Sequence, residues 1–407
     1  MTSRPPSSRP QFDPTHFARD LDAIRATLEP LRTSADLRHL RRFHWASWLA
    51  VVVALALSVW GFNPLSPVLF ALAASTRWMV IGHHVCHGAL DALPQTPRHW
   101  RSAHFARGVW RWLLWPDWLD PAAWCHEHNQ LHHAYTNDPA DPDVPQLQAG
   151  WLRDTSKPLV LRYLVVLLVA ISWRWLYYAP NTASFFANSQ RKMRTAAEPL
   201  LDRASRERLW DPRSPAGRQL WLRSWLPYLG FTYGFVPLLV LPWGLHAWAV
   251  ALVHLVLAEA LCSAHTFAVI VPNHAGDDLP LFEGRARGKG QWYRRQILSS
   301  CNYTTGGAIN DWLHGYLNYQ IEHHLWPDLT PRQYVQAAPL VRAVCAQHGV
   351  AYVQQSLWRR VGKLVAVLTG VATQRVERVA LPILAANDDA PNPTVQSHLA
   401  RPLSAQA

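Results

Sequence analysis

Three short segments of the chain carry histidines at the spacing of metal ligands. The histidines concerned are His83, His87, His128, His132, His133, His323 and His324. Two imidazoles four residues apart, such as those of His83 and His87, share one face of a helix and can reach one metal ion. His128 and His132 have the same spacing, while His133 points about 100° away from His132 and suits a second metal. Seven imidazoles exceed the four ligands of a structural zinc site, so the pattern predicts two metal ions.

The third segment also contains Gln320, which shares a helix face with His323 and His324 through i, i+3 and i+4 spacing. Glu322 points elsewhere, and we expect it to accept a hydrogen bond that orients an imidazole. Three further candidates for ligands or supporting residues are Asn273, His274 and His84. The loop after the second segment holds three carboxylates that we expect to be loop or supporting groups, namely Asp138, Asp141 and Asp143.

The ligand type narrows the choice of metal. Carboxylates and carbonyls are the ligands of calcium and magnesium, whereas imidazole suits zinc and iron. Iron is the natural choice if the chemistry is oxygen activation, and the residues alone leave zinc open.

Long apolar segments must position these histidines. The sequence is 49 % apolar and 16 % charged, whereas soluble domains are about 25 % charged. Apolar runs at 46–62, 65–81, 222–241 and 246–271 predict four membrane-spanning helices. Short uncharged turns join them into two hairpins. The net charge of +12 fits arginines on cytoplasmic flanks, and no nucleic-acid recognition motif is present.

The hairpins are predicted to bring all the histidine segments to one side of the membrane. Arg42 precedes the first hairpin and Arg223 the second, so the positive-inside rule places both open ends and both termini in the cytoplasm. Segment 158–180 is apolar as well, but it contains Arg174. A third crossing there would separate the second and third histidine segments. We therefore interpret 158–180 as an interfacial helix.

The predicted architecture is an all-α integral membrane protein, with four transmembrane helices as two hairpins and a helical cytosolic cap that carries the histidines. A single domain spans 16–371 and starts with an amphipathic helix, whereas residues 1–15 and 386–407 are predicted to be disordered. Glu259 in the fourth span is costly to bury, so we expect either a functional role or a partner in His254 or His265.

At these residues the chain resembles the membrane fatty acid desaturases, a non-haem di-iron family with three histidine boxes, in its bacterial-type form without fused cytochrome b5. The resemblance is carried by GHHVCHGAL, HNQLHHAYTND, NYQIEHHLWP and NHAGDD and covers roughly residues 17–365. It implies that two iron ions are held by the seven histidines above, with His274 as an eighth ligand. Gln320 stands where some relatives have histidine, and His84 where relatives commonly have an acidic residue. The HxxxH spacing of the first box argues against the stearoyl-CoA subgroup.

The resemblance implies an O₂-dependent desaturase of lipid metabolism and fatty acid biosynthesis, which introduces a double bond into an acyl lipid or acyl-CoA in the bacterial inner membrane. Because the sequence lacks a His-Pro-Gly-Gly haem motif, we expect electrons from a separate ferredoxin or cytochrome. The nearest alternative is a hydroxylase or ketolase of the same superfamily, which uses the same boxes. A membrane metal transporter or sensor fits less well, because transporters place their ligands near the bilayer midplane.

Overall fold

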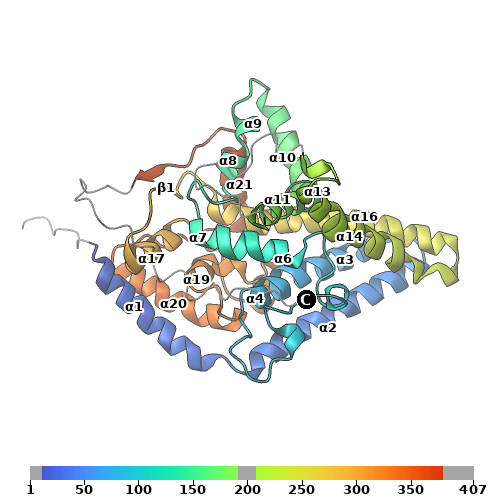
Figure 1. Cartoon of the computed structure of the whole chain (residues 1–407), viewed down its shortest axis with the longest axis horizontal. Helices are drawn as coiled ribbons and strands as arrows, with labels where there is room; N and C mark the ends of the chain where they lie inside the picture. Colours follow the sequence, from blue (N-terminus) through green and yellow to red (C-terminus); the bar gives the residue numbers. More distant parts are fainter. Residues whose placement is uncertain (1–11, 191–207, 379–407) are drawn as a thin grey trace, which may run out of the picture.

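The computed structural model describes residues 12–190 and 208–378 and consists mostly of helices (Figure 1). Two short strands, β1 (Leu281–Glu283) and β2 (Val376–Arg378), pair in parallel. The predominance of helix confirms that part of the predicted fold class. The predicted disordered tail and residues 1–11 lie outside the described residues, and helix α1 (Pro14–Leu28) already begins at Pro14, two residues before the predicted start of the domain.

The first predicted hairpin is present as a helix–turn–helix. Helix α2 (Ser34–Val59) begins at a capping box, in which Thr33 and Asp36 satisfy each other's free backbone N–H groups. Gly61, with φ of +123°, makes the turn that the sequence predicted. Helix α3 (Leu65–Ser75) then returns toward the cap and continues through the π-helical η2 (Thr76–Gly82) into α4 (His83–Cys86).

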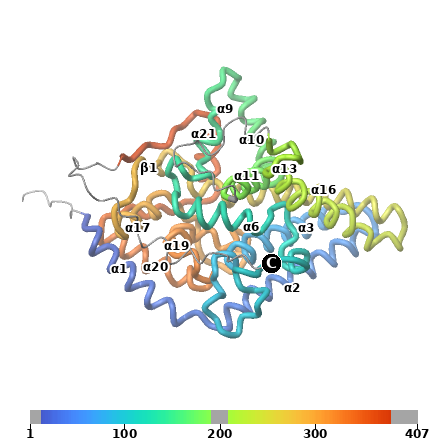
Figure 2. The backbone as a smooth tube through the Cα atoms, viewed as in Figure 1, coloured from blue at the N-terminus to red at the C-terminus, as the bar shows by residue number. Residues whose placement is uncertain are grey.

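The second hairpin packs beside the first. Its first arm is a continuous run of short elements: α13 (Pro215–Arg218), η6 (Gln219–Trp225), α14 (Leu226–Tyr228), η7 (Leu229–Phe235) and α15 (Val236–Leu238). After η8 (Leu241–Trp243), helix α16 (Leu245–Ile270) and η9 (Val271–His274) return to the cap. His254 in α16 joins the second hairpin to the turn of the first, because its Nε2 accepts from the Asn63 N–H at 3.1 Å and its Nδ1 donates to Ser58 Oγ at 2.8 Å. Figure 2 shows both tips at the end of the molecule far from the cap.

Four helices in the described part of the chain are long and apolar enough to cross a membrane: Ser34–Val59, Leu65–Cys86, Leu159–Ser189 and Leu245–His274. Three of them overlap the predicted spans 46–62, 65–81 and 246–271. The fourth overlaps the predicted interfacial segment 158–180, while the predicted span 222–241 is not among them. Length and composition do not separate a helix that crosses the bilayer from one that lies in its surface. The two-hairpin membrane topology therefore stays a prediction.

The helix in question comprises α10 (Leu159–Trp173), η5 (Arg174–Tyr178) and α11 (Ala179–Gln190). Its outer face exposes large apolar side chains such as Leu168, which suits contact with lipid. Arg174, fully buried, bonds Asp117 at 2.5 Å and Glu259 at 3.0 Å. The alternative that Glu259 pairs with a histidine is wrong, because its partners include Arg174 and the hydroxyl of Tyr228. A buried carboxylate such as Glu259 needs an opposite charge beside it, and the packing of the α10–η5 helix against α16 places Arg174 there.

The elements outside the two helical hairpins are called the cap and lie at the hairpin ends away from the turns (Figure 1). Among them are α1, α17 (Gly288–Leu298), α19 (Gln320–Leu325) and α20 (Pro331–Gln347). The predicted amphipathic helix is confirmed as α1, whose apolar side chains Phe17, Leu21, Ile24 and Leu28 are buried. It packs on α17 and α20. The remaining short elements are η1 (Glu29–Leu31), η3 (Arg98–Trp100), α5 (Trp110–Leu114), α6 (Pro121–Trp124), η4 (Cys125–His132), α7 (His133–Tyr135), α8 (Pro145–Gln148), α9 (Gly150–Arg153), α18 (Ala308–Leu313), η10 (Leu317–Tyr319) and α21 (Leu357–Leu368).

Candidate metal centre

The three histidine segments meet where the hairpins join the cap. The first lies on α4, at the inner end of the first hairpin, and the third lies on α19. The second spans η4 and α7, of which η4 is π-helical. In a π-helix, hydrogen bonds link residues five apart, so that His128 and His133 face the same way. The structure therefore differs from the expected pairing of His128 with His132.

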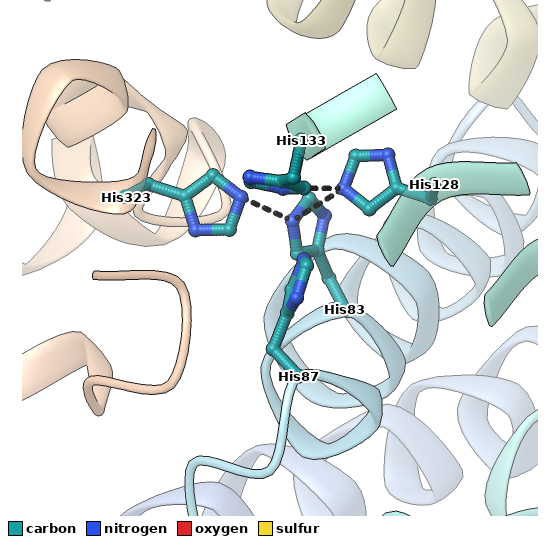
Figure 3. Close-up of side chains that lie close together, drawn as sticks. All are labelled: His83, His87, His128, His133 and His323. Atoms are coloured by element: carbon teal, nitrogen blue, oxygen red, sulfur yellow. Dashed lines mark hydrogen bonds between the residues drawn. The ribbon is translucent and has the colours of Figure 1, made fainter. Parts of the chain in front are cut away.

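Five histidines form the first cluster: His83, His87, His128, His133 and His323. One ring nitrogen from each lies within 4.8 Å of the others, and all five are buried. His83 Nε2 is 2.9 Å from His323 Nε2 and 3.3 Å from His128 Nε2. Figure 3 shows the five rings converging from α4, the η4–α7 segment and α19. Hydrophobic packing of the surrounding helices thus assembles a site that no single segment contains.

His132, His274 and His324 form a second, adjacent cluster, again with ring nitrogens within 4.8 Å. The rings of His133 and His324 stack with centroids 4.3 Å apart, which joins the two clusters. Although His323 and His324 are neighbours in sequence, they belong to different clusters. The amide of Gln320 completes the second one: its Nε2 is 2.9 Å from His274 Nε2, and its Oε1 is buried without a partner in the described structure.

The donor set fits metal ions. Several buried nitrogens have no hydrogen-bond partner among the described residues, including both ring nitrogens of His87 and Nε2 of His324. Lone pairs of neutral imidazoles that converge on one point repel each other unless a cation lies between them. Two clusters of three to five imidazoles therefore suit two metal ions, and the protein contains a buried histidine metal centre.

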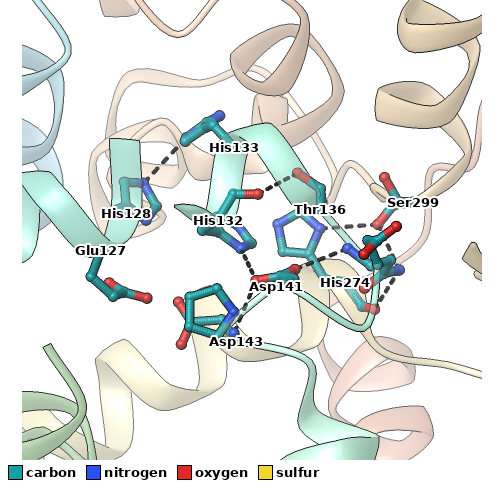
Figure 4. Close-up of polar contacts among 12 residues, drawn as sticks. Glu127, His128, His132, His133, Thr136, Asp141, Asp143, His274 and Ser299 are labelled. Atoms are coloured by element: carbon teal, nitrogen blue, oxygen red, sulfur yellow. Dashed lines mark hydrogen bonds and ion pairs between the residues drawn. The ribbon is translucent and has the colours of Figure 1, made fainter. Parts of the chain in front are cut away.

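Hydrogen bonds at the outer ring nitrogens orient several of these imidazoles. His132 Nδ1 donates to Asp141 at 3.0 Å and His274 Nδ1 to the Ser299 carbonyl at 2.9 Å (Figure 4). His323 Nδ1 contacts the hydroxyl of Tyr334, and His324 Nδ1 the amide oxygen of Gln296, both at 3.0 Å. Each bond fixes a tautomer with Nε2 free to bind a metal. Sequence analysis singled out Asp141 but missed Ser299, Gln296 and Tyr334, which stand in segments without a metal-ligand pattern.

Electrostatics keeps most of these rings neutral. Burial lowers the pKa of His87, His128, His133, His323 and His324 well below its ordinary value. His132 differs, because attraction to the Asp141 carboxylate outweighs its burial and raises its pKa. Neutral imidazole is the form that binds metal.

The other predicted site residues lie outside the two clusters. His84 bonds the Val80 carbonyl through Nδ1 and packs against Tyr334, and Asn273 donates to the Leu317 carbonyl. Glu322 accepts from Asn302 at 2.8 Å and from the hydroxyl of Tyr352 at 2.9 Å. The expectation that Glu322 orients an imidazole is therefore wrong, since it faces the opposite side of α19.

A carboxyl pair lies next to His128 (Figure 4). Burial raises the pKa of Glu127, and it raises the pKa of Asp143 to about 6. The hydroxyl of Tyr178 donates to Glu127 at 3.4 Å. Sequence patterns do not pair these two carboxyls, because Glu127 stands in η4 and Asp143 in the loop that follows the second histidine segment.

An apolar cavity of about 320 Å³ lies beside the centre. One wall is made by site residues: His83, His128, His132, His274 and Gln320. The other walls come mainly from α8, α9, the α10–η5 helix and the inner end of α16, with side chains such as Val166, Trp173 and Phe267. The apolar walls of the cavity and the imidazoles of the two clusters thus face the same space.

The fold and the site define a mostly helical protein with a buried histidine metal centre and four helices that are long and apolar enough to cross a membrane, and comparison with known proteins identifies its family. Residues 59–356 match the model of the family described as fatty acid desaturase. The chain is 28 % identical over 375 residues to the NADPH-dependent stearoyl-CoA 9-desaturase of Mycobacterium tuberculosis. This match covers 86 % of the present chain and 80 % of the relative. It is 24 % identical over 299 residues to the Delta(5) fatty acid desaturase A of Dictyostelium discoideum. This match covers 70 % of the present chain and 58 % of the relative. The chain belongs to the fatty acid desaturase family.

Family membership makes the protein a membrane oxidoreductase of lipid metabolism. The Mycobacterium relative is named for stearoyl-CoA. The HxxxH spacing of the first box is therefore not a sufficient reason to set that substrate aside for this chain.

Proposed function

We propose that the protein uses two iron ions and O₂ to introduce a double bond into the acyl chain of a lipid or acyl-CoA, with electrons from a separate ferredoxin or cytochrome. The observation that carries the proposal is the shared wall between the histidine clusters and the apolar cavity. The proposed ligands are the eight clustered histidines, with Gln320 beside the second cluster. A stearoyl-CoA desaturase among the relatives supports an acyl-CoA or lipid substrate.

Bound iron would supply what no side chain has, the activation of O₂ for oxidation of an unactivated C–H bond. The residues of the chain do the positioning. Asp141, Ser299 and Tyr334 hold the imidazoles at their outer nitrogens. Apolar side chains such as Val166 and Phe267 hold the acyl chain against the centre and keep water away from it. The carboxyl pair Glu127–Asp143 lies within reach of the same space and holds a proton there.

We further propose that the protein lies in the bacterial inner membrane with the metal centre and both termini on the cytoplasmic side. Exposed apolar side chains at the hairpin tips, such as Trp60 and Trp243, support a position of the tips inside the bilayer or at its far surface. Exposed arginines flank the other end. Figure 1 shows α10 steeply inclined to the hairpins, which supports an interfacial position for that helix. Cysteine accessibility of the tip and the cap from each side of vesicles tests this orientation.

Expression in a host that lacks the activity, followed by mass spectrometry of its lipids, tests the reaction. We expect an acyl product that has lost two hydrogens and that disappears in a His87→Ala variant. A product that has gained an oxygen atom would identify a hydroxylase or ketolase instead. Metal analysis of the purified protein tests the cofactor, because zinc without iron would contradict the oxidative mechanism and favour a transporter or sensor.

A further inference from the structure

A chain of aromatic side chains leads from the metal centre to the surface. His323 in the first cluster contacts the hydroxyl of Tyr334 at 3.0 Å. His84 lies beside Tyr334, with ring centroids 5.8 Å apart, and beside Tyr316, with centroids 6.4 Å apart. The hydroxyl of Tyr316 contacts Nε2 of His39 at 3.0 Å. None of these five residues is among those that line the acyl cavity, so the path is separate from the proposed substrate site.

The inner side chains of this path are shielded from solvent, whereas the side chain at its outer end is partly exposed. His84 and Tyr334 are fully buried, Tyr316 is 6 % exposed, and His39 is partly exposed. Tyr316 has a φ of +61°, which is strained for a residue with a side chain. This backbone conformation places the Tyr316 ring between the rings of His39 and His84. Strained backbone conformations concentrate at functional positions.

The surface around His39 is basic. Arg38 and Arg42 on α2 and Arg332 at the start of α20 are exposed, and the latter two lie close enough to His39 to act on it electrostatically. Arg332 is 3.6 Å from the buried Asp36. Arg42 has no carboxylate partner among the residues that the structure describes. This surface therefore presents more arginine than carboxylate charge at the outer end of the path.

We propose that the surface formed by Arg38, His39, Arg42 and Arg332 binds a small acidic electron-transfer protein, and that Tyr316, His84 and Tyr334 carry its electrons to the metal centre. Complementary charge steers such a partner and fixes its orientation. The inference rests on the proposed function, which needs an external donor. Per turnover two reduced donor molecules bind in succession and give up one electron each, and these two electrons, together with two hydrogens from the acyl chain and two protons from solvent, reduce O₂ to two water molecules.

Arginines next to a membrane span also attract anionic lipid head groups. Arg41 and Arg42 separate the two roles, because both flank the same span but face different sides of α2. Arg42 acts on His39, whereas Arg41 acts on His44 and His99. A lipid contact predicts similar effects for the two arginines, while the docking surface predicts an effect for Arg42 alone.

Binding of an acidic [2Fe–2S] ferredoxin and of an acidic soluble cytochrome is measured on the full-length protein in nanodiscs of neutral phosphatidylcholine, with and without phosphatidylglycerol. For at least one of the two donors, we expect Arg42→Glu and Arg332→Glu each to weaken binding about tenfold, and Arg41→Glu less than about twofold, with loss of the difference at high salt. Equal losses for Arg41→Glu and Arg42→Glu, a difference seen only with phosphatidylglycerol, or no binding by the wild type would each overturn the docking surface.

The path is tested by the rate at which the iron-loaded protein oxidises the bound, reduced donor. Tyr316→Leu should lower that rate at least about tenfold while donor affinity and reduction by dithionite stay within about twofold. Phe43→Leu is the matched control, because Phe43 packs on both His39 and Tyr316 but off the path to His84. An unchanged rate in Tyr316→Leu, or an equal loss with dithionite, would contradict the path. Donor binding and donor oxidation are both measured without detecting the lipid product. A failure of the proposed desaturation can therefore be distinguished from a failure of the docking surface or the path.

Discussion

Asp141 accepts a hydrogen bond from Nδ1 of His132 at 3.0 Å, and both side chains are buried. The same carboxylate accepts from the backbone N–H groups of Asn137 and Asp143, so it holds the loop after the second histidine box against the ring. The bond turns Nε2 of His132 toward His274 and His324. Asp141 is therefore the residue through which the loop orients the second cluster.

Asp141→Asn should lower the affinity of the second metal position by about 10- to 100-fold, because such outer partners fix ring orientation and ligand basicity. Iron titration of the metal-free protein against a chelator measures the change. Asp138→Asn is the control, since Asp138 caps the backbone of Ala140 and contacts no imidazole. Equal affinities in wild type and Asp141→Asn would argue against this role.

Two separate clusters predict two metal ions that can be removed one at a time. His87→Ala and His324→Ala each remove one imidazole, from the first and the second cluster respectively. Each should lower the metal content from about two ions toward about one per chain, because the affected position loses one of its imidazole ligands and binds its ion more weakly. Inductively coupled plasma analysis measures the content, and the exposed His246 at the hairpin tip provides the His246→Ala control. Loss of both ions in either variant would indicate one shared site.

Removal of Arg174 should destabilise the protein by about 3–5 kcal/mol, because Asp117 and Glu259 would be left buried without their counter-charge. Arg174→Met keeps the volume but not the charge, and thermal unfolding in detergent measures the loss. Arg218→Met, at an exposed position, should change the midpoint little. If Arg174→Met unfolds at the wild-type temperature, the buried pairs do not contribute to stability.

Acid should destabilise the metal-free protein. Burial lowers the pKa of five clustered histidines below its ordinary value of 6.5. Above pH 6.5 these histidines are neutral in both the folded and the unfolded protein. Below pH 6.5 they bind protons in the unfolded chain but not in the folded one, so the free energy of unfolding decreases as the pH is lowered. Each histidine contributes on the order of 1 kcal/mol per pH unit until its folded pKa is reached. Thermal midpoints of the apoprotein from about pH 7.5 to 5.5 measure the slope, and a flat profile would contradict the buried, neutral rings.

Bulk added to the cavity should shorten the preferred acyl chain. Val166 lines the cavity and is 6 % exposed, whereas its neighbour Leu167 points outward and is 59 % exposed. Val166→Phe should lower desaturation of long chains relative to short ones, because overpacking removes room for methylenes, while Leu167→Phe leaves the profile unchanged. Lipid profiling of both variants, together with their metal content, separates a narrowed cavity from a damaged centre. A profile shift in Leu167→Phe alone would place the acyl chain elsewhere.

Local patterns were sufficient for several elements. The turn at Gly61, the amphipathic face of α1 and the mostly helical fold follow from periodicity and turn residues, and the structure has all three. The membrane character of segment 159–189 was harder to assign. Its composition equals that of a span, and the buried Arg174 in it has its partners Asp117 and Glu259 at positions that are distant in sequence.

The sequence by itself identified the imidazoles that meet, because the eight histidines that it indicated as metal ligands all lie in the two clusters. Only the tertiary structure decided how they divide. Helical spacing assumes an α-helix, but the π-helical η4 pairs His128 with His133, and packing of α19 sends His323 and His324 to different clusters. The supporting contacts from Tyr334, Gln296 and Ser299 also join residues far apart in the chain, which spacing within one segment does not predict.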